Sequence, residues 1–257
     1  NAKGDYITFV DADDWLPDFM VKIENLILQN KYHIIIGGFL AIAENDTVIN
    51  RNTTNYINKE EIIADFISWK LKIRLGSFLI KREILLKNKI VFNTNYKYAE
   101  DVDVITRCLY FADKTIVIDE IFYHYLIQEN SAISIVNFNR FHSYIAKNNL
   151  YLFFKKRENF KKVEKIYVGY QLPEAIIDVV EMLCQKRVNI STTLKHLQEN
   201  NYYQVLEEKR LNEFTPIHIK EKIRRFKKNP YYFCIKTNID FLVSHLKSKV
   251  YKLLYKA

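Results

Sequence analysis

The chain has 257 residues, of which 49% are hydrophobic, and a formal net charge of +9. The apolar content excludes a disordered chain, and the positive charge favours anionic partners such as sugar nucleotides or acidic lipid surfaces. Three widely spaced cysteines exclude a disulfide framework and a cysteine-based zinc site, and they favour a reducing compartment.

An apolar segment near the start of the chain runs directly into three acids. Residues 6–10 are β-branched or aromatic, which predicts a strand buried on both faces and therefore central in a mostly parallel sheet. Asp11, Asp13 and Asp14 follow at its carboxyl end, where open α/β sheets bind ligands. A divalent cation would relieve the repulsion between these carboxylates. A turn or a helix cap is the alternative interpretation.

Helices and strands are predicted to follow as far as residue 126. We expect helices over residues 17–29, 58–72 and 83–88, and another beginning near residue 100. Asn58 is the expected cap of the second helix. We expect strands over residues 33–42 and 47–50, a short apolar element over 76–82, and strand-like segments at 116–118 and 121–126.

The composition changes near residue 137. Beyond it we predict amphipathic helices over residues 138–156, 160–185, 191–208 and 217–227, followed by one or two helices over residues 230–256. No apolar run of about 18 residues occurs, so no membrane span is expected.

Three features, in this order, resemble the family 2 glycosyltransferases. The first is the Asp11-Ala12-Asp13 segment, with Lys3 and Gly4 before its strand and Pro17 after it. The second is the pair Glu100-Asp101 at a helix start. The third is Tyr123-His124-Tyr125, with the polar segment 130–134 after it.

The resemblance covers about residues 1–135 and implies a partial GT-A (Rossmann-like) mixed-sheet core. Residues 1–136 would be the C-terminal portion of a GT-A domain, and residues 137–257 an all-helical extension. Family members begin with segments that bind the nucleotide base and ribose, and these do not occur here. The resemblance therefore predicts a partial sequence that lacks the N-terminal nucleotide-binding part, and it leaves open whether this chain is active by itself.

The family inverts the anomeric centre in one displacement, with a metal at the leaving diphosphate and a base at the acceptor hydroxyl. By resemblance, Asp13 would bind Mn²⁺ or Mg²⁺ directly, and Asp11 would bind the metal or the nucleotide ribose. Asp101 would be the base, and Glu100 would position the acceptor or hold Asp101. His124 would add a metal or diphosphate contact. The expected donor is a nucleotide sugar, with a UDP-sugar favoured.

One departure concerns the arginines that usually follow the aromatic strand in this family. Leu126 and Gln128 stand at those places. The diphosphate clamp that the arginines would provide is therefore not visible in the sequence.

The expected acceptor is a surface glycan of capsule, lipopolysaccharide or teichoic-acid type, or a lipid-linked precursor. A basic and aromatic C-terminal region suits an anionic membrane surface, so we expect a cytoplasmic protein, peripheral on the inner face of the membrane. No nucleic acid partner is expected. Two alternatives stay open: a haloacid-dehalogenase-like phosphatase that uses Asp11 and Asp13, and a non-enzymatic basic helical module that docks on membranes.

Overall fold

The computed structural model describes residues 2–18, 20–29, 31–43, 46–54, 56, 58–128 and 135–255. The chain divides into two compact units. Unit 1 comprises Asn1–Ile135 and Ala146–Glu164, and unit 2 comprises Val136–Ile145 and Lys165–Ala257. The division proposed from sequence, between residues 136 and 137, stays a prediction.

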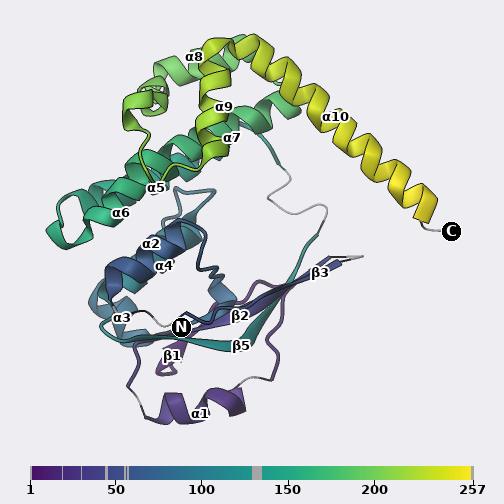
Figure 1. The fold of residues 1–257 in the computed structure, drawn as a ribbon. Helices are drawn as coiled ribbons and strands as arrows, with labels where there is room; N and C mark the ends of the chain where they lie inside the picture. Colours follow the sequence, from purple (N-terminus) through teal and green to yellow (C-terminus); the bar gives the residue numbers. More distant parts are fainter. Residues whose placement is uncertain are drawn as a thin grey trace. The chain divides into compact units, whose positions relative to one another are not determined.

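A five-stranded mixed sheet forms the centre of unit 1 (Figure 1). Strand β2 (Ile34–Ala43) pairs in parallel with β5 (Thr115–Leu126) along one side. Its other side pairs antiparallel with β4 (Phe78–Lys81) and with β3 (Asp46–Asn50). The first three residues of β2 are isoleucines without solvent exposure, which explains why this strand is central.

The prediction that the first strand is central in a mostly parallel sheet is wrong. Strand β1 has two residues (Tyr6–Ile7), and its one partner among the described residues is β4, in antiparallel orientation, at the end of the strand order. Its side chains are half-buried. An apolar run indicates burial but does not specify the neighbouring strands, and the more strongly apolar β2 occupies the centre.

Helices cover both faces of this sheet (Figure 1). On one face lies α1 (Met20–Leu28), whose Ile23 packs against Ile35, Leu79 and Phe122. Gly37 of β2 is required there, since any Cβ would collide with the Phe122 ring. On the opposite face lie α2 (Lys59–Ile67) and α4 (Glu100–Phe111), and the short helix α3 (Arg82–Lys87) follows β4 directly.

Most of the elements predicted for unit 1 are confirmed, with two corrections. The Asn58 side chain caps α2 by accepting a hydrogen bond from the Glu61 amide, at 2.9 Å. However, α2 ends at Ile67, just before Trp69 takes a positive φ of 64°. The two strand-like segments after residue 115 form one strand, because a bulge opposite residues 36–39 absorbs the polar residues between them.

Unit 2 is helical. Its elements pack around α7 (Leu172–Gln185), whose Ile176, Val180 and Leu183 are without solvent exposure. The others are α8 (Ile190–Glu199), α9 (Ile217–Lys228) and α10 (Pro230–Tyr255). The chain passes from unit 2 to unit 1 within α5 (His142–Lys155) and returns to unit 2 within α6 (Lys161–Ile166). The prediction of an α/β mixed-sheet core followed by a helical region is confirmed.

A search of the helices in the described residues finds none with the length and apolar character that a membrane span requires.

Candidate functional site

The turn of residues 11–14, here called the acidic turn, is attached to β5 by two sets of hydrogen bonds and closed by a third bond of its own. The Asp14 carboxylate accepts a hydrogen bond from the Tyr123 hydroxyl and another, at 2.7 Å, from the Leu126 amide. The backbones of Trp15 and His124 exchange hydrogen bonds of 3.2 and 2.9 Å. Within the turn, the Asp14 amide donates a hydrogen bond of 3.1 Å to the Asp11 carbonyl. The acidic turn is therefore fixed to a strand far away in sequence.

The carboxylates of the acidic turn have different roles. Asp14 is engaged by β5, whereas Asp11 and Asp13 are exposed. Desolvation by the surrounding protein atoms raises the pKa of Asp11 even though its side chain is exposed, and the neighbouring charges of Asp14, Asp13 and Asp101 raise it further, while Arg74 acts in the opposite direction. Negative charge is therefore concentrated at this turn, and one of the contributing carboxylates, Asp101, comes from another element.

That other element is the start of α4. The helix begins after Ala99, which takes a left-handed φ of 63°, and Glu100 and Asp101 form its first turn. Burial raises the pKa of Glu100, and the charges of Asp101 and Asp11 act in the same direction. The two predicted acidic motifs therefore lie together, and the N-terminal end of the helix dipole stabilises the second one.

An ion pair between two residues of α4 follows these acids along the helix. The Asp103 side chain is 5% exposed, and both of its oxygens accept hydrogen bonds of 3.0 Å from Arg107 Nε. The Arg107 guanidinium also lies over the Phe153 ring, 5.2 Å from its centroid. The Asp103–Arg107 pair thus stabilises the helix that carries Glu100 and Asp101.

His124 does not join the acidic side chains. Side chains alternate between the two faces of a strand, so His124 and Phe122 lie on the face of α1, whereas Tyr123 and Tyr125 lie on the other. The His124 ring packs edge-on against Trp15, with centroids 5.1 Å apart, and burial lowers its pKa. Its Nδ1 is buried without a hydrogen-bond partner among the described residues.

The sequence analysis missed Arg74, the basic residue that lies against this site. Its guanidinium carbon lies 3.8 Å from the centroid of the Tyr125 ring. Ser77 is fully buried and supports Arg74: its hydroxyl accepts a hydrogen bond from the Arg74 amide at 3.1 Å and donates one to the Arg74 carbonyl at 3.0 Å. No local sequence pattern predicts this position of Arg74, because it depends on the contact with Tyr125 of β5.

The polar segment 130–134 lies outside the described residues. Within the described part of the chain, no group of three or more His, Cys, Asp and Glu side chains is arranged to hold a metal ion. Asp11 and Asp13 offer two exposed carboxylates, and Mg²⁺ commonly takes one or two carboxylates and completes its shell with water and phosphate oxygens. These residues fit a cation that is shared with a bound diphosphate.

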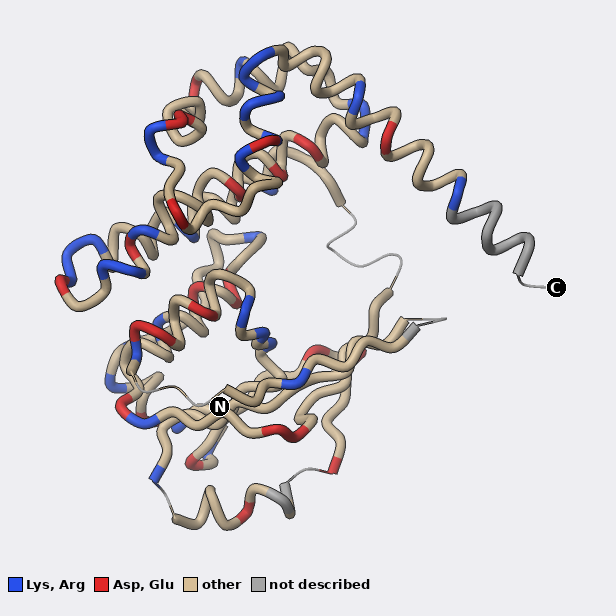
Figure 2. The backbone as a smooth tube through the Cα atoms, in the orientation of Figure 1, with Lys and Arg blue, Asp and Glu red and all other residues tan. Residues whose placement is uncertain are grey.

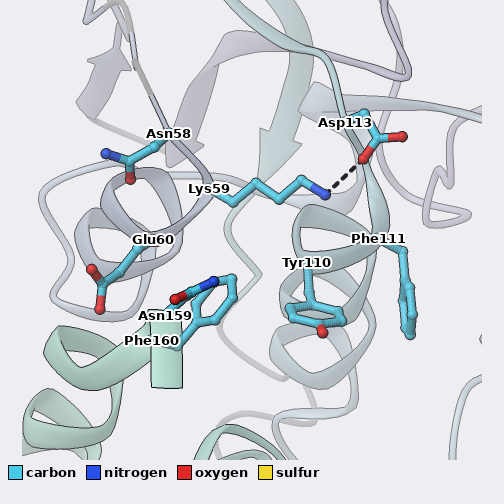
Figure 3. Close-up of a pocket in the computed structure, with 8 residues that line it drawn as sticks. All are labelled: Asn58, Lys59, Glu60, Tyr110, Phe111, Asp113, Asn159 and Phe160. Carbon is cyan, nitrogen blue, oxygen red and sulfur yellow. Dashed lines mark hydrogen bonds and ion pairs between the residues drawn. The ribbon is translucent and has the colours of Figure 1, made fainter. Parts of the chain in front are cut away.

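A cavity of about 690 Å³ lies at the other end of α4 (Figure 3). Tyr110, Phe111 and Phe160 line it, together with a 2.8 Å ion pair between Lys59 and Asp113. One helical turn rises about 5.4 Å, so the roughly ten residues from Asp101 to this cavity span about 15 Å. The cavity is therefore separate from the acidic residues.

Comparisons with known proteins agree with the motifs. Residues 1–88 match the model of glycosyl transferase family 2, which confirms the resemblance drawn from the sequence. A poly(ribitol-phosphate) beta-glucosyltransferase of Bacillus spizizenii is 31% identical over 132 residues, which are 50% of this chain and 20% of the relative. The chain thus spans about one fifth of the length of this curated relative.

Two solved structures of S. aureus TarS 1-349 are also similar. The complex with UDP-GlcNAc is 15% identical, with a TM-score of 0.46, and the alignment covers 93% of this chain and 66% of that chain. The other structure is 13% identical, with a TM-score of 0.49 and coverage of 93% and 65%.

The attachment of the acidic turn is tested by Tyr123→Phe. The substitution leaves the partly buried Asp14 carboxylate without one donor, so we expect the free energy of unfolding to fall by about 1–3 kcal/mol. Urea denaturation followed by circular dichroism measures this change. Tyr151→Phe, on α5, is the control and should change little. Equal stability of Tyr123→Phe and the wild type would show that this hydrogen bond does not hold the turn.

Proposed function

We propose that this chain, through the family 2 glycosyltransferase segment in its residues 1–88, transfers a sugar from a nucleotide-sugar donor to a surface glycan of teichoic-acid type. The observation that carries the proposal is the proximity of the acidic turn to Glu100 and Asp101. The match to a poly(ribitol-phosphate) beta-glucosyltransferase supports the class of acceptor.

Asp101 is proposed as the general base. It would accept the proton of the acceptor hydroxyl while the hydroxyl oxygen attacks the anomeric carbon and the bond to the leaving diphosphate breaks. This single displacement inverts the anomeric configuration. Glu100, whose pKa is raised by burial and by the charges of Asp101 and Asp11, would position the acceptor next to the base.

Asp13 and Asp11 are proposed to hold Mn²⁺ or Mg²⁺ when the donor binds. The cation would neutralise the negative charge that develops on the leaving diphosphate. His124 is proposed to act indirectly, because its ring and backbone hold Trp15 beside the acidic turn. The phosphatase alternative, with Asp11 as nucleophile and Asp13 as acid, is not favoured, since the family match lies in the transferases.

Asp101→Asn tests the base. The substitution keeps the size of the side chain but removes its basicity, so we expect kcat to fall by about 10²- to 10⁴-fold with donor affinity unchanged. The assay is transfer from a panel of UDP-sugars to poly(ribitol phosphate). Asp113→Asn, at an exposed position two residues beyond the far end of the same helix, is the matched control and should retain full kcat. A fully active Asp101→Asn variant would exclude Asp101 as the base.

Asp13→Ala tests the cation. Removing a residue that only hydrogen-bonds to a metal ligand already weakens metal binding about 10- to 100-fold. Removing Asp13, a direct ligand, should therefore weaken Mn²⁺ binding at least about tenfold. Calorimetric titration of Mn²⁺ in the presence of UDP measures the affinity. The exposed Asp18→Ala variant is the control. Unchanged Mn²⁺ affinity in Asp13→Ala would contradict the metal role.

Unit 2 is proposed to contact the anionic inner surface of the membrane. The basic residues of α9 (Figure 2) are partly paired within the protein, because Lys222 binds Asp178 and Glu181 at 3.1 and 2.5 Å. The membrane contact is therefore assigned to α10, whose apolar side chains are 40–60% exposed at Ile235, Ile239, Leu242 and Leu246. Lys236, which lies between them, and Lys247, which follows Leu246, would add about 1 kcal/mol each near an acidic surface.

The membrane proposal predicts that the protein sediments at low salt with vesicles of phosphatidylcholine and phosphatidylglycerol. The double variant Ile235→Ser with Ile239→Ser should sediment much less, because apolar area buried in the interface is lost. Val21→Ser, which removes an exposed apolar side chain from α1 of unit 1, should behave as the wild type. Equal sedimentation of the double variant and the wild type would exclude this role for α10.

A further inference from the structure

Arg74 is held in place because the residues that follow it contact Thr8, which precedes the acidic turn, and Tyr123, which binds that turn. It precedes the 3-10 turn Leu75–Ser77, and the Thr8 hydroxyl donates to the Leu75 carbonyl at 3.1 Å. Gly76 lies against the face of the Tyr123 ring so closely that a Cβ would collide with it. Thr8 leads into the acidic turn and Tyr123 binds Asp14. The chain therefore places Arg74 beside the turn by contacts that involve no ligand.

The Arg74 guanidinium is ordered but not satisfied by the protein. It lies 3.8 Å from the centroid of the Tyr125 ring and 5.2 Å from that of Phe39. Its Nε is buried, and among the described residues no hydrogen-bond partner reaches this atom. A buried charged donor without a partner is costly, and such groups in native proteins call for an explanation such as an absent ligand.

The chemistry of this group selects an anion with several oxygens. A guanidinium presents a planar fork of N–H donors that matches phosphate in a bidentate way. The aromatic rings fix the plane of the fork, which reduces the entropy lost when an anion binds. The carboxylates of the acidic turn lie close, yet the part of the chain that the structure describes contains no ion pair with Arg74. The donors are thus available.

We propose that Arg74 binds a phosphate group of the substrates and takes the place of the arginines that are absent at Leu126 and Gln128. The inference rests on the proposed function, in which the site receives a nucleotide diphosphate and a phosphate-containing acceptor. The phosphate belongs either to the donor diphosphate or to a phosphodiester of the acceptor, and both offer Arg74 the same anionic oxygens. Binding is electrostatic, without a covalent step.

Arg74→Met is the variant of choice, because methionine can keep the apolar contact with Tyr125 while removing the charge and all donors. Arg74→Lys keeps the charge but not the planar fork. Arg51→Met is the matched control: Arg51 is an exposed arginine of the same unit, paired with Asp119 at 2.8 Å. Affinities for UDP and for uridine, with Mn²⁺ present, and the KM for poly(ribitol phosphate) are measured for each protein.

If the donor supplies the phosphate, Arg74→Met weakens UDP binding by about 10- to 100-fold and leaves uridine binding unchanged. If the acceptor supplies it, UDP binding is unchanged and the KM for poly(ribitol phosphate) rises by a similar factor. In both cases Arg74→Lys recovers part of the loss. The proposal is overturned if neither quantity changes, or if Arg51→Met changes them equally.

Failure of the proposed function gives a different result. In that case the wild type binds no UDP and transfers no sugar. Binding of inorganic diphosphate to the wild type and to the Arg74 variants still tests Arg74, since this probe needs neither a nucleotide site nor an acceptor. Equal binding of inorganic diphosphate by the wild type and both Arg74 variants would then overturn the assignment.

Discussion

The hydrogen bond from the Tyr123 hydroxyl to the Asp14 carboxylate joins two segments that are 109 residues apart in sequence. The Leu126 amide donates to the same carboxylate, and Trp15 and His124 pair beside it. Strand β1 is too short to fix the acidic turn, because it contributes only two residues to the edge of the sheet. The attachment to β5 therefore determines where Asp11 and Asp13 stand relative to α4.

The site that results is rich in negative charge, and its structure offsets that charge in three ways. Asp14 is neutralised in part by two hydrogen-bond donors. Glu100 and Asp101 lie at the positive end of the α4 dipole. Arg74 lowers the pKa of Asp11, against desolvation and the neighbouring carboxylates that raise it. The repulsion that remains is of the kind that a cation with a diphosphate would relieve, and this links the electrostatics to the proposed transfer reaction.

Local patterns predicted much of the fold and the family, and long-range contacts explain what they missed. The isoleucine run of β2, the Asn58 cap and the acids at the start of α4 each depend on neighbours in sequence, so the sequence revealed them. The edge position of β1 depends on its pairing with β4, which composition does not encode. The face taken by His124 and the place of Arg74 both depend on the register of β5, so no motif indicated them.

The most direct test is a crystal structure of the protein with UDP and Mn²⁺. The account predicts a cation about 2.0–2.3 Å from a carboxylate oxygen of Asp13 or Asp11, in contact with the diphosphate. The ligand should lie on the side of Tyr123 and Tyr125, with Asp101 facing the position of the anomeric carbon. A nucleotide bound on the His124 side of the sheet, or in the cavity of Figure 3, would contradict the account.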